Sequence, residues 1–457
     1  MRSYFFKKIL QNEGWLDNVL LEVDASGRIS RLEPNAIEHK SSIINGYAIP
    51  GFQNAHSHAF QYAMAGLAEV HDTAHKSDNF WSWREAMYRL ALSVTPDQME
   101  AIATQLYCEM VRHGYTNVAE FHYIHHDKNG KPYNNLAEMG SRMVAAAKTA
   151  GINITLIPIF YQKGGFGKEP LEGQKRFISS TTDEYLMLLE SSEKACTYYS
   201  GANIALGIHS MRGVAANSII EVATSGPQNI PFHIHIAEQL KEIEDCSAYL
   251  SRRPVEWLLE NINVTERFHL VHATHLTSEE TIGIAKSGAN VVLCPSTEGN
   301  LGDGIFPLIE YQKHQGIWSI GTDSHIGINP LEELRLLDYG QRLISHQRDT
   351  FSKENGDSGQ FAIDMAIIGG RKAMNNKTQQ FFKIGEPLNA AIFDSSSPLL
   401  KTAKDKNLSS SILYTSNLDH QSGTIVNGIM KTENGKHILS NEIEHKFINT
   451  IQELGNR

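Results

Sequence analysis

Short runs of β-branched and other apolar residues alternate with longer amphipathic stretches along most of the chain. This alternation is typical of a parallel sheet whose strands are joined by crossover helices. Eight such runs are predicted to be strands, which favours a TIM barrel, the (β/α)8 fold of the α/β class. The predicted strands are Ala48–His58, Thr116–His122, Ile154–Tyr161, Ile204–His209, Phe232–Ile236, Phe268–His272, Val291–Pro295 and Trp318–Asp323.

One predicted helix lies between the first two strands. Thr95 can act as its N-cap, Pro96 fits the first helical position, and Gly114 supplies a C-terminal stop. Apolar residues recur at helical spacing between these ends and predict one buried face. They are Met99, Ile102, Leu106 and Met110.

The two ends of the chain carry a different pattern of short strand-like runs. We expect residues 1–47 and 385–457 to form one small β-sandwich beside a barrel of residues 48–384. Residues 73–80 and 162–175 are predicted to be long βα loops, which carry function in a barrel. The strand-like runs are Asn18–Val23, Ile29–Leu32, Ala390–Asp394, Ile412–Tyr414 and Gly423–Val426, the last followed by a turn at Asn427-Gly428.

Composition narrows the class of partner. Hydrophobic residues make up 41% and charged residues 20% of the 457 residues, as in ordinary globular proteins. The net charge of −10 argues against nucleic acid, and no apolar run reaches the length of a membrane helix. The four cysteines are scattered, and the first ten residues lack the apolar core of a signal peptide. We therefore expect a cytoplasmic protein that acts on a small molecule.

Histidines and acids follow the predicted strands. His56 and His58 end the first strand, where residues two apart point the same way and can share one metal ion. His235 ends the fifth strand, with Glu238 just beyond it. His233 lies on the face of His235, so spacing alone does not decide between them, but we expect His233 to be a packed, hydrogen-bonded core histidine.

Two more such residues end the sixth and eighth strands. His272 ends the sixth, and Asp323 ends the eighth, where a lone aspartate is more often a helix N-cap. Together, three histidines and one carboxylate at one barrel rim form a zinc-type ligand set that leaves a position for water. Zinc would lower the pKa of that water toward ~7, and Glu238 and His272 are the candidates for proton transfer. Fe²⁺ and Mn²⁺ also suit such a site, and the role of His275 stays open.

This arrangement resembles the amidohydrolase superfamily over nearly the whole chain. The matching motifs are P-G-F-x-N-x-H-S-H on strand one, H-x-x-E on strand five, a histidine on strand six and G-T-D-S on strand eight. The deaminase branch of that superfamily uses a single metal ion, so the resemblance implies one ion per subunit.

Narrower stretches resemble the formimidoylglutamate deiminase family. The resemblance implies hydrolysis of N-formimidoyl-L-glutamate to N-formyl-L-glutamate and ammonia during histidine degradation, by a homodimer. The matching stretches are His56-Ser-His-Ala-Phe-Gln-Tyr-Ala-Met-Ala-Gly66, Phe80-Trp-Ser-Trp-Arg84, Glu120-Phe-His-Tyr123, Gly207-Ile-His-Ser-Met-Arg212, His235-Ile-Ala-Glu-Gln239, Arg253-Pro-Val-Glu-Trp257, Leu293-Cys-Pro-Ser-Thr-Glu298 and Glu332-Glu-Leu-Arg-Leu336.

Carried over residue by residue, the resemblance implies a role for each site residue. Glu238 moves the proton from water to the departing nitrogen, and His272 hydrogen-bonds the attacking hydroxide or the substrate nitrogen. Asp323 takes part in catalysis as well as holding the ion. The implied metal ligands are His56, His58, His235 and Asp323. The implied substrate-binding residues are Gln61, Arg84, Tyr123, His209 and Arg212, and arginine forks suit a substrate with two carboxylates.

Two alternatives stay open. A deaminase of the same fold could act on guanine or a related heterocycle, because Trp81 and Trp83 offer surfaces for stacking. A non-catalytic relative could instead use the barrel as a binding module. Such a protein typically loses metal ligands, whereas all four candidates and Glu238 are present here.

Overall fold

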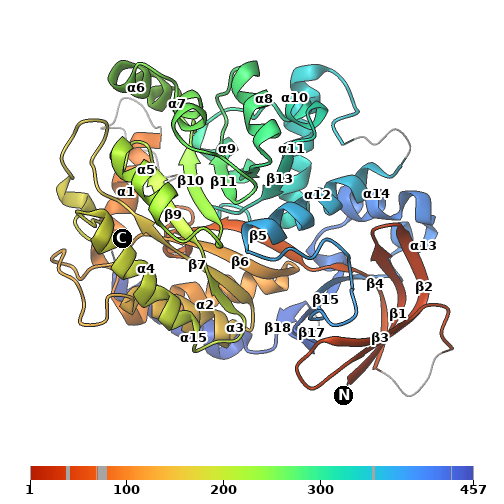
Figure 1. Cartoon of the computed structure of the whole chain (residues 1–457). Helices are drawn as coiled ribbons and strands as arrows, with labels where there is room; N and C mark the ends of the chain where they lie inside the picture. The colour runs from red at the N-terminus through yellow and green to blue at the C-terminus, as the bar shows by residue number, and fades with distance from the viewer. Residues whose placement is uncertain are drawn as a thin grey trace.

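In a computed structural model that describes residues 2–37, 42–67, 69, 80–351, 356–433 and 435–455, eight parallel strands form a nearly closed barrel (Figure 1). A bridge between Ser57 and Asp323 links the first strand to the chain just after the last. The predicted TIM barrel is confirmed. Its strands are β5 (Phe52–Ser57), β6 (Tyr115–His122), β7 (Asn153–Phe160), β9 (Leu206–Ser210), β10 (Phe232–Ile236), β11 (Phe268–His272), β12 (Asn290–Leu293) and β13 (Ile317–Ile320), with β8 (Ala202–Ile204) paired to β7.

The barrel strands are buried along nearly their whole length, as expected for parallel strands covered on both faces. Ala55, Val271, Val292 and Cys294 pack with Ala373 in a small cluster separate from the main core. Val271 is the register partner of His235 on the neighbouring strand, so this cluster lies directly beside the histidines that end the strands.

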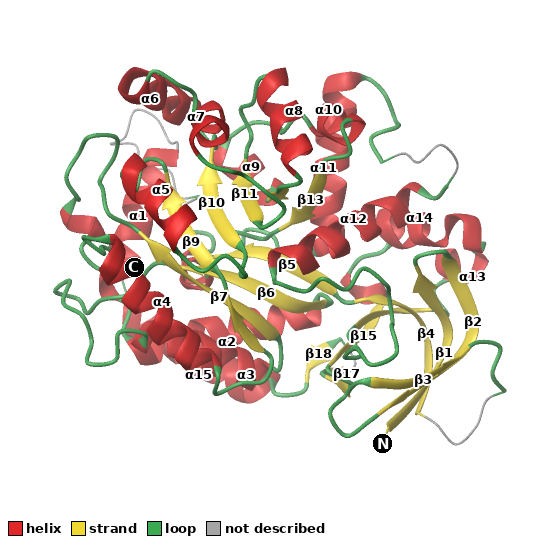
Figure 2. Cartoon of the chain, in the orientation of Figure 1, coloured by secondary structure: helices red, strands yellow, loops and turns green. Residues whose placement is uncertain are grey.

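Helices surround the strands (Figure 2). The predicted helix after Thr95 is confirmed: the Thr95 side chain accepts a hydrogen bond from the backbone N–H of Gln98 in a capping box. Among the described residues, no helix has both the length and the apolar character needed to cross a membrane. The barrel helices are α1 (Phe80–Ser93), α2 (Pro96–Arg112), α3 (Glu138–Ala150), α4 (Thr182–Cys196), α5 (Ala216–Ser225), α6 (Leu240–Leu250), α7 (Pro254–Asn261), α8 (Ser278–Ser287), α9 (Pro295–Leu301), α10 (Leu308–Lys313), α11 (Pro330–Ser345) and α12 (Ser358–Ala373), with 3₁₀ turns η1 (Ala59–Met64) and η2 (Glu172–Gln174).

Both ends of the chain build a second sheet, as predicted, and Figure 1 shows red N-terminal strands beside the blue C-terminal strand β15. Its pairs are antiparallel except β1 with β4. The turn at Asn427-Gly428 is confirmed between β15 and β16, with φ of +49° and +71°. In spatial order the strands are β16 (Ile429–Met430), β15 (Gln421–Val426), β14 (Ala390–Asp394), β4 (Ser42–Pro50), β1 (Arg2–Gln11), β2 (Gly14–Val23) and β3 (Ile29–Glu33).

The remaining C-terminal elements are mostly helical. Helix α15 (Ser440–Leu454) returns to the barrel and packs against α2, and its Phe447 ring lies 5.5 Å from that of Tyr62. The other elements are α13 (Pro398–Thr402), α14 (Asp405–Thr415), η3 (Leu418–His420), β17 (Thr432–Glu433) and β18 (Lys436–His437).

The structure corrects two of the predicted strands. Ile412–Tyr414 lies in helix α14, because the buried Leu408 and Ile412 are four residues apart and share one helical face. Residues 48–50 of the predicted first barrel strand belong to β4 of the second sheet, and the barrel strand begins at Phe52, after Gly51. Of the predicted loop 73–80, residues 73–79 lie outside the described residues.

Candidate metal centre

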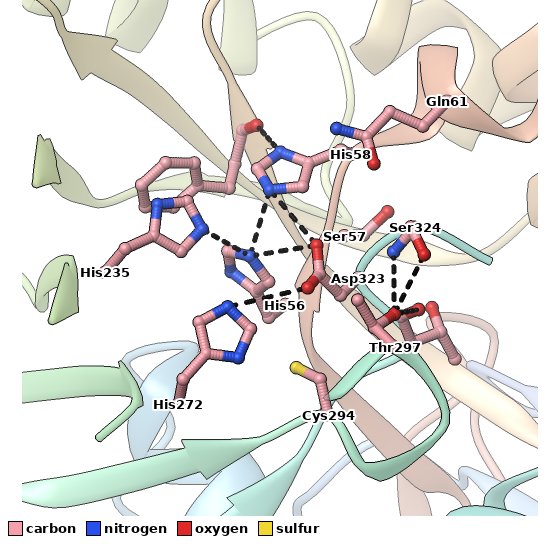
Figure 3. Close-up of polar contacts among 12 residues, drawn as sticks. His56, Ser57, His58, Gln61, His235, His272, Cys294, Thr297, Asp323 and Ser324 are labelled. Atoms are coloured by element: carbon pink, nitrogen blue, oxygen red, sulfur yellow. Dashed lines mark hydrogen bonds and ion pairs between the residues drawn. The ribbon is translucent and has the colours of Figure 1, made fainter. Parts of the chain in front are cut away.

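The histidines and the aspartate singled out in the sequence meet at the carboxyl ends of the barrel strands (Figure 3). His56 lies on β5 with His58 just beyond it, His235 lies on β10, and His272 ends β11. Asp323 follows β13. Because all parallel strands end at the same rim, residues up to 267 positions apart in sequence share one site.

Three imidazole nitrogens converge within this cluster. The Nε2 atom of His56 lies 3.1 Å from that of His58 and 3.0 Å from that of His235. Asp323 Oδ1 lies 3.3 Å from His58 Nε2 and 3.6 Å from His56 Nε2. One ligand atom from each of the three histidines falls within 4.8 Å of the others, so a single ion can contact all of them.

In two of the rings, a hydrogen bond made by Nδ1 determines which ring nitrogen carries the proton. His58 Nδ1 donates to the carbonyl of Phe121 and His235 Nδ1 to that of His209, each at 2.8 Å. A carbonyl only accepts, so both Nε2 atoms present lone pairs to the centre. Burial lowers the pKa of His58 to about 3 and that of His235 well below its usual value, so neither ring carries a second proton.

The donor set fits a divalent metal ion. His56 is fully buried, and its pKa is also lowered well below the usual value by burial. Its Nδ1 has no hydrogen-bond partner among the described residues, and its Nε2 faces the lone pairs of two other rings. Converging lone pairs repel each other unless a cation lies between them. Three nitrogens and one carboxylate oxygen are the ligands that zinc and similar ions prefer.

Strained backbone holds two of these residues, and two residues close to them in sequence, in place. Ala237, His272, Asp323 and His325 have φ between +48° and +68°, a region that residues other than glycine rarely adopt. Burial also raises the pKa of Asp323 to about 7, helped by the charges of nearby acids. A cation at the centre would offset this cost by neutralising the carboxylate.

His272 is held from one side and faces acids on the other. Its Nδ1 lies 3.2 Å from Glu298 Oε1, while its Nε2 lies 3.6 Å from Asp323 Oδ2 and 3.9 Å from Glu238 Oε1. Burial lowers the pKa of His272, but the hydrogen bond to Glu298 and the charges of Glu238 and Asp323 outweigh burial and raise the pKa to about 10.

A pocket opens directly above the cluster. Arg212 Nη2 donates to Glu238 Oε2 at 2.9 Å on its wall, and Gln61 Nε2 donates to the Tyr123 hydroxyl at 2.9 Å. The pocket therefore joins the histidine cluster to a buried ion pair and to several aromatic rings. Its lining consists of His58, Gln61, Trp83, Arg84, Met87, Tyr88, Tyr123, Tyr161, Phe177, His209, Arg212, His235, Glu238, His272, Leu301 and Asp323.

The chain is similar in sequence to known proteins. The model of the Amidohydrolase family matches residues 47–428. A formimidoylglutamate deiminase from Pseudomonas aeruginosa is 40% identical over 456 residues, covering 99% of this chain and 100% of that protein. The chain belongs to the amidohydrolase family.

Solved structures show the same fold, and other relatives are more distant in sequence. The crystal structure of an amidohydrolase from Brucella melitensis has a TM-score of 0.94 and 40% identity, covering 99% of this chain and 100% of that chain. A zinc-bound adenosine deaminase from Xanthomonas campestris has a TM-score of 0.82 at 18% identity, covering 99% and 98%. An 8-oxoguanine deaminase from Pseudomonas aeruginosa is 24% identical over 65% of this chain and 64% of its own length. Family membership confirms the expectation of a hydrolytic enzyme.

In this amidohydrolase, every residue predicted for the site lies at the site. The four predicted metal ligands cluster, and Gln61, Arg84, Tyr123, His209 and Arg212 all line the pocket with Glu238 and His272. Their individual roles stay predictions. As expected, His233 is a buried core histidine, and its Nε2 donates to the carbonyl of Ala373 at 2.9 Å. The side chain of Trp81 lies outside the described residues, whereas Trp83 lines the pocket.

Sequence reasoning missed two buried acids that hold the site together. Glu298 binds His272 and also accepts a hydrogen bond from the backbone of Cys294 at 2.8 Å. Glu120 accepts from the Ser57 hydroxyl and from the backbone of Ala59, each at 2.7 Å, which fixes the turn after β5. Both acids follow or interrupt apolar strand segments, and that position was the available signal.

Proposed function

We propose that this amidohydrolase converts N-formimidoyl-L-glutamate and water into N-formyl-L-glutamate and ammonia, as a step of histidine degradation. The observation that carries the proposal is the pair Arg84 and Arg212 on the wall of the pocket above the metal centre. Similarity to a formimidoylglutamate deiminase along the whole chain supports the same conclusion.

The two arginines suit a substrate with two carboxylates. A guanidinium can bind a carboxylate through two parallel hydrogen bonds, which fixes its orientation as well as its position. Arg84 extends from α1, and Arg212 extends from the segment after β9. An amino acid carrying a formimidoyl group on its nitrogen would span the pocket from these arginines to the histidine cluster.

The centre would hold one Zn²⁺ per subunit through His56, His58, His235 and Asp323, with Fe²⁺ and Mn²⁺ as alternatives. When bound, such an ion lowers the pKa of a water molecule toward ~7 and supplies hydroxide at neutral pH. The chain itself positions the substrate and moves the proton.

Glu238 is the proposed proton carrier. Its Oε2 is held by Arg212, so its Oε1, which is turned toward His272, would accept the proton of the attacking water. Water adds to the formimidoyl carbon, Glu238 Oε1 passes the two protons of this water in turn to the terminal nitrogen, and the bond from the carbon to that nitrogen breaks. One water is consumed and one ammonia is released. His272 Nε2 would hydrogen-bond the attacking oxygen or the substrate nitrogen.

A heterocycle deaminase is the second candidate, because aromatic rings make up much of the pocket wall. Trp83, Tyr88, Tyr123, Tyr161 and Phe177 line it, and planar bases stack on such rings. The 8-oxoguanine deaminase named above is one of the relatives. Two arginines on the wall favour the dicarboxylate instead. A homodimer and a cytoplasmic location stay predictions.

Ammonia release from several substrates in parallel tests the proposal. Formimidoylglutamate, formimidoylglycine, guanine, 8-oxoguanine and cytosine would each be incubated with the zinc-loaded protein. We expect rapid release from formimidoylglutamate and much slower release from formimidoylglycine, which lacks the second carboxylate. Release from a base but not from formimidoylglutamate would reject the assignment.

A further inference from the structure

A second group of metal-ligating side chains lies beside the first. One ligand atom each from His272, Cys294 and Asp323 fall within 4.8 Å of one another, and all three residues are buried. Figure 3 shows the Cys294 sulfur next to the imidazole of His272, with the carboxylate of Asp323 close to both. Nothing in the proposed reaction uses this thiol.

The His272 ring is oriented as metal-binding histidines are. A carboxylate oxygen of Glu298 accepts from its Nδ1 at 3.2 Å, which leaves Nε2 facing Asp323 Oδ2 at 3.6 Å. Carbonyl groups orient His58 and His235 in the same way. Such outer partners fix the ring and make its inner nitrogen a better ligand.

Asp323 can serve both groups at once. Its Oδ1 faces His56 and His58, at 3.6 and 3.3 Å, whereas its Oδ2 faces His272 Nε2 at 3.6 Å. Carboxylates with this disposition can bridge two metal ions, as in two-metal hydrolases, whose ions lie ~3.5–4 Å apart.

We propose that His272, Cys294 and Asp323 Oδ2 form a second, inhibitory site for a soft divalent ion such as Zn²⁺ or Cd²⁺. A thiolate prefers soft ions and disfavours Mg²⁺ and Mn²⁺, so the site discriminates between metals. Binding replaces the thiol proton of Cys294 by the ion, and this proton passes to the buffer.

Inhibition follows from the position of the second ion. His272 Nε2 lies 3.9 Å from Glu238 Oε1. An ion bound to this nitrogen would therefore occupy the space that the proposed reaction needs for substrate binding by His272 and proton transfer by Glu238. This part of the proposal rests on the proposed function, whereas binding of the second ion does not.

Cadmium binding tests the site without any assay of activity. Protein that already holds one zinc per chain would be titrated with Cd²⁺ while the ultraviolet cadmium–thiolate absorption and the bound metal are measured. We expect a second ion and a thiolate band in the wild type. C294S and C294A should bind the second ion at least about tenfold more weakly and lack the band. C246S, which changes another buried cysteine in α6, should behave as wild type. A second ion bound equally well by C294S would overturn the proposal.

Zinc inhibition then tests the consequence. Excess Zn²⁺ should inhibit the wild type and C246S, and C294S should need at least about tenfold more zinc for the same inhibition. Equal sensitivity of C294S, or equal inhibition by Mn²⁺, would contradict an inhibitory thiolate site. If the protein proved inactive toward formimidoylglutamate, the proposed function would fail, and the cadmium titration would still decide whether the second site exists.

Discussion

Arg212 lies between two acids, and this position links substrate binding to proton transfer. Its Nη2 is 2.9 Å from Glu238 Oε2, and its Nε is 4.0 Å from Glu242 Oε2. Arg212 is nearly buried, and so are both acids, so the ion pairs are poorly screened by water. The sequence suggested a substrate-binding arginine, and the structure adds that the same residue holds Glu238.

Replacing Glu238 by glutamine should separate metal binding from turnover. E238Q keeps the size of the side chain and its contact with Arg212 but cannot accept a proton. We expect wild-type zinc content and a loss of kcat of about 10²–10⁴-fold, the usual contribution of general acid–base catalysis. Steady-state kinetics and metal analysis on the same sample check this. A near-normal kcat would show that Glu238 is not the proton carrier.

Replacing the two arginines should give different kinetic results. R84A should raise KM with little change in kcat, by roughly tenfold to a hundredfold, because it removes hydrogen bonds to a charged group worth ~1.5–3 kcal/mol. R212A should raise KM and also lower kcat, because Glu238 loses its partner. Kinetics with formimidoylglutamate distinguish the two. The same KM-only effect in both variants would contradict the second function given to Arg212.

Helix α11 reaches the site through a buried acid. Glu333, in its first turn, accepts hydrogen bonds from the backbone N–H and the hydroxyl of Ser296 in α9, at 2.9 and 2.5 Å. Burial raises the pKa of Glu333 from 4.5 to about 8, although the bonds from Ser296 oppose this. The contact therefore ties α11 to the helix that carries Glu298.

The raised pKa of Glu333 gives a stability prediction with a definite sign. Between pH 4.5 and 8 the unfolded chain releases this proton and the folded protein keeps it, so the contribution of Glu333 to stability falls as pH rises. The melting temperature of wild type minus that of E333Q should therefore decrease from pH 5 to pH 8, by the equivalent of about 1–3 kcal/mol. Calorimetry of both proteins at the two pH values checks this, and an increase would contradict the assignment.

At this scale, sequence predicts strands better than their ends. Buried parallel strands show as apolar runs, so all eight barrel strands were found. Periodicity did not show that Gly51 divides one run between two sheets, or that Ile412–Tyr414 continues a helix, because both outcomes depend on packing.

The metal ligands could be predicted because strand ends share one rim. Glu298 and the Arg212–Glu238 pair could not, because these residues lie beyond the strand ends, where packing of helices and loops decides which side chains meet.

The two ends of the chain meet in the second sheet, where one glycine makes the contact possible. Gly27 has φ of +82°, and a Cβ atom there would lie 1.9 Å from the carbonyl oxygen of Asn427. Its own carbonyl accepts a hydrogen bond from the backbone of Leu388 at 3.0 Å. Residues almost the full length of the chain apart therefore touch backbone to backbone.

The substitution G27A should therefore destabilise the protein by more than the cost of placing alanine at a positive φ. Gly385 provides a matched control, with φ of +88° and no described atom within 4 Å of the place that a Cβ atom would take. G385A should cost about 1–2 kcal/mol from the left-handed conformation, and G27A should cost more because the Asn427 backbone must move. Melting temperatures at one scan rate compare them. Equal losses would show that the chain ends do not meet closely there.

The proposed metal centre depends on residues at the ends of three strands, β5, β10 and β13, holding a single ion at the barrel mouth. Anomalous X-ray diffraction at the zinc edge, on crystals of protein purified with one equivalent of zinc, tests this most directly. We predict one peak about 2.0–2.2 Å from Nε2 of His56, His58 and His235 and from Asp323 Oδ1. No peak at this position, or a peak bound by other side chains, would contradict the account.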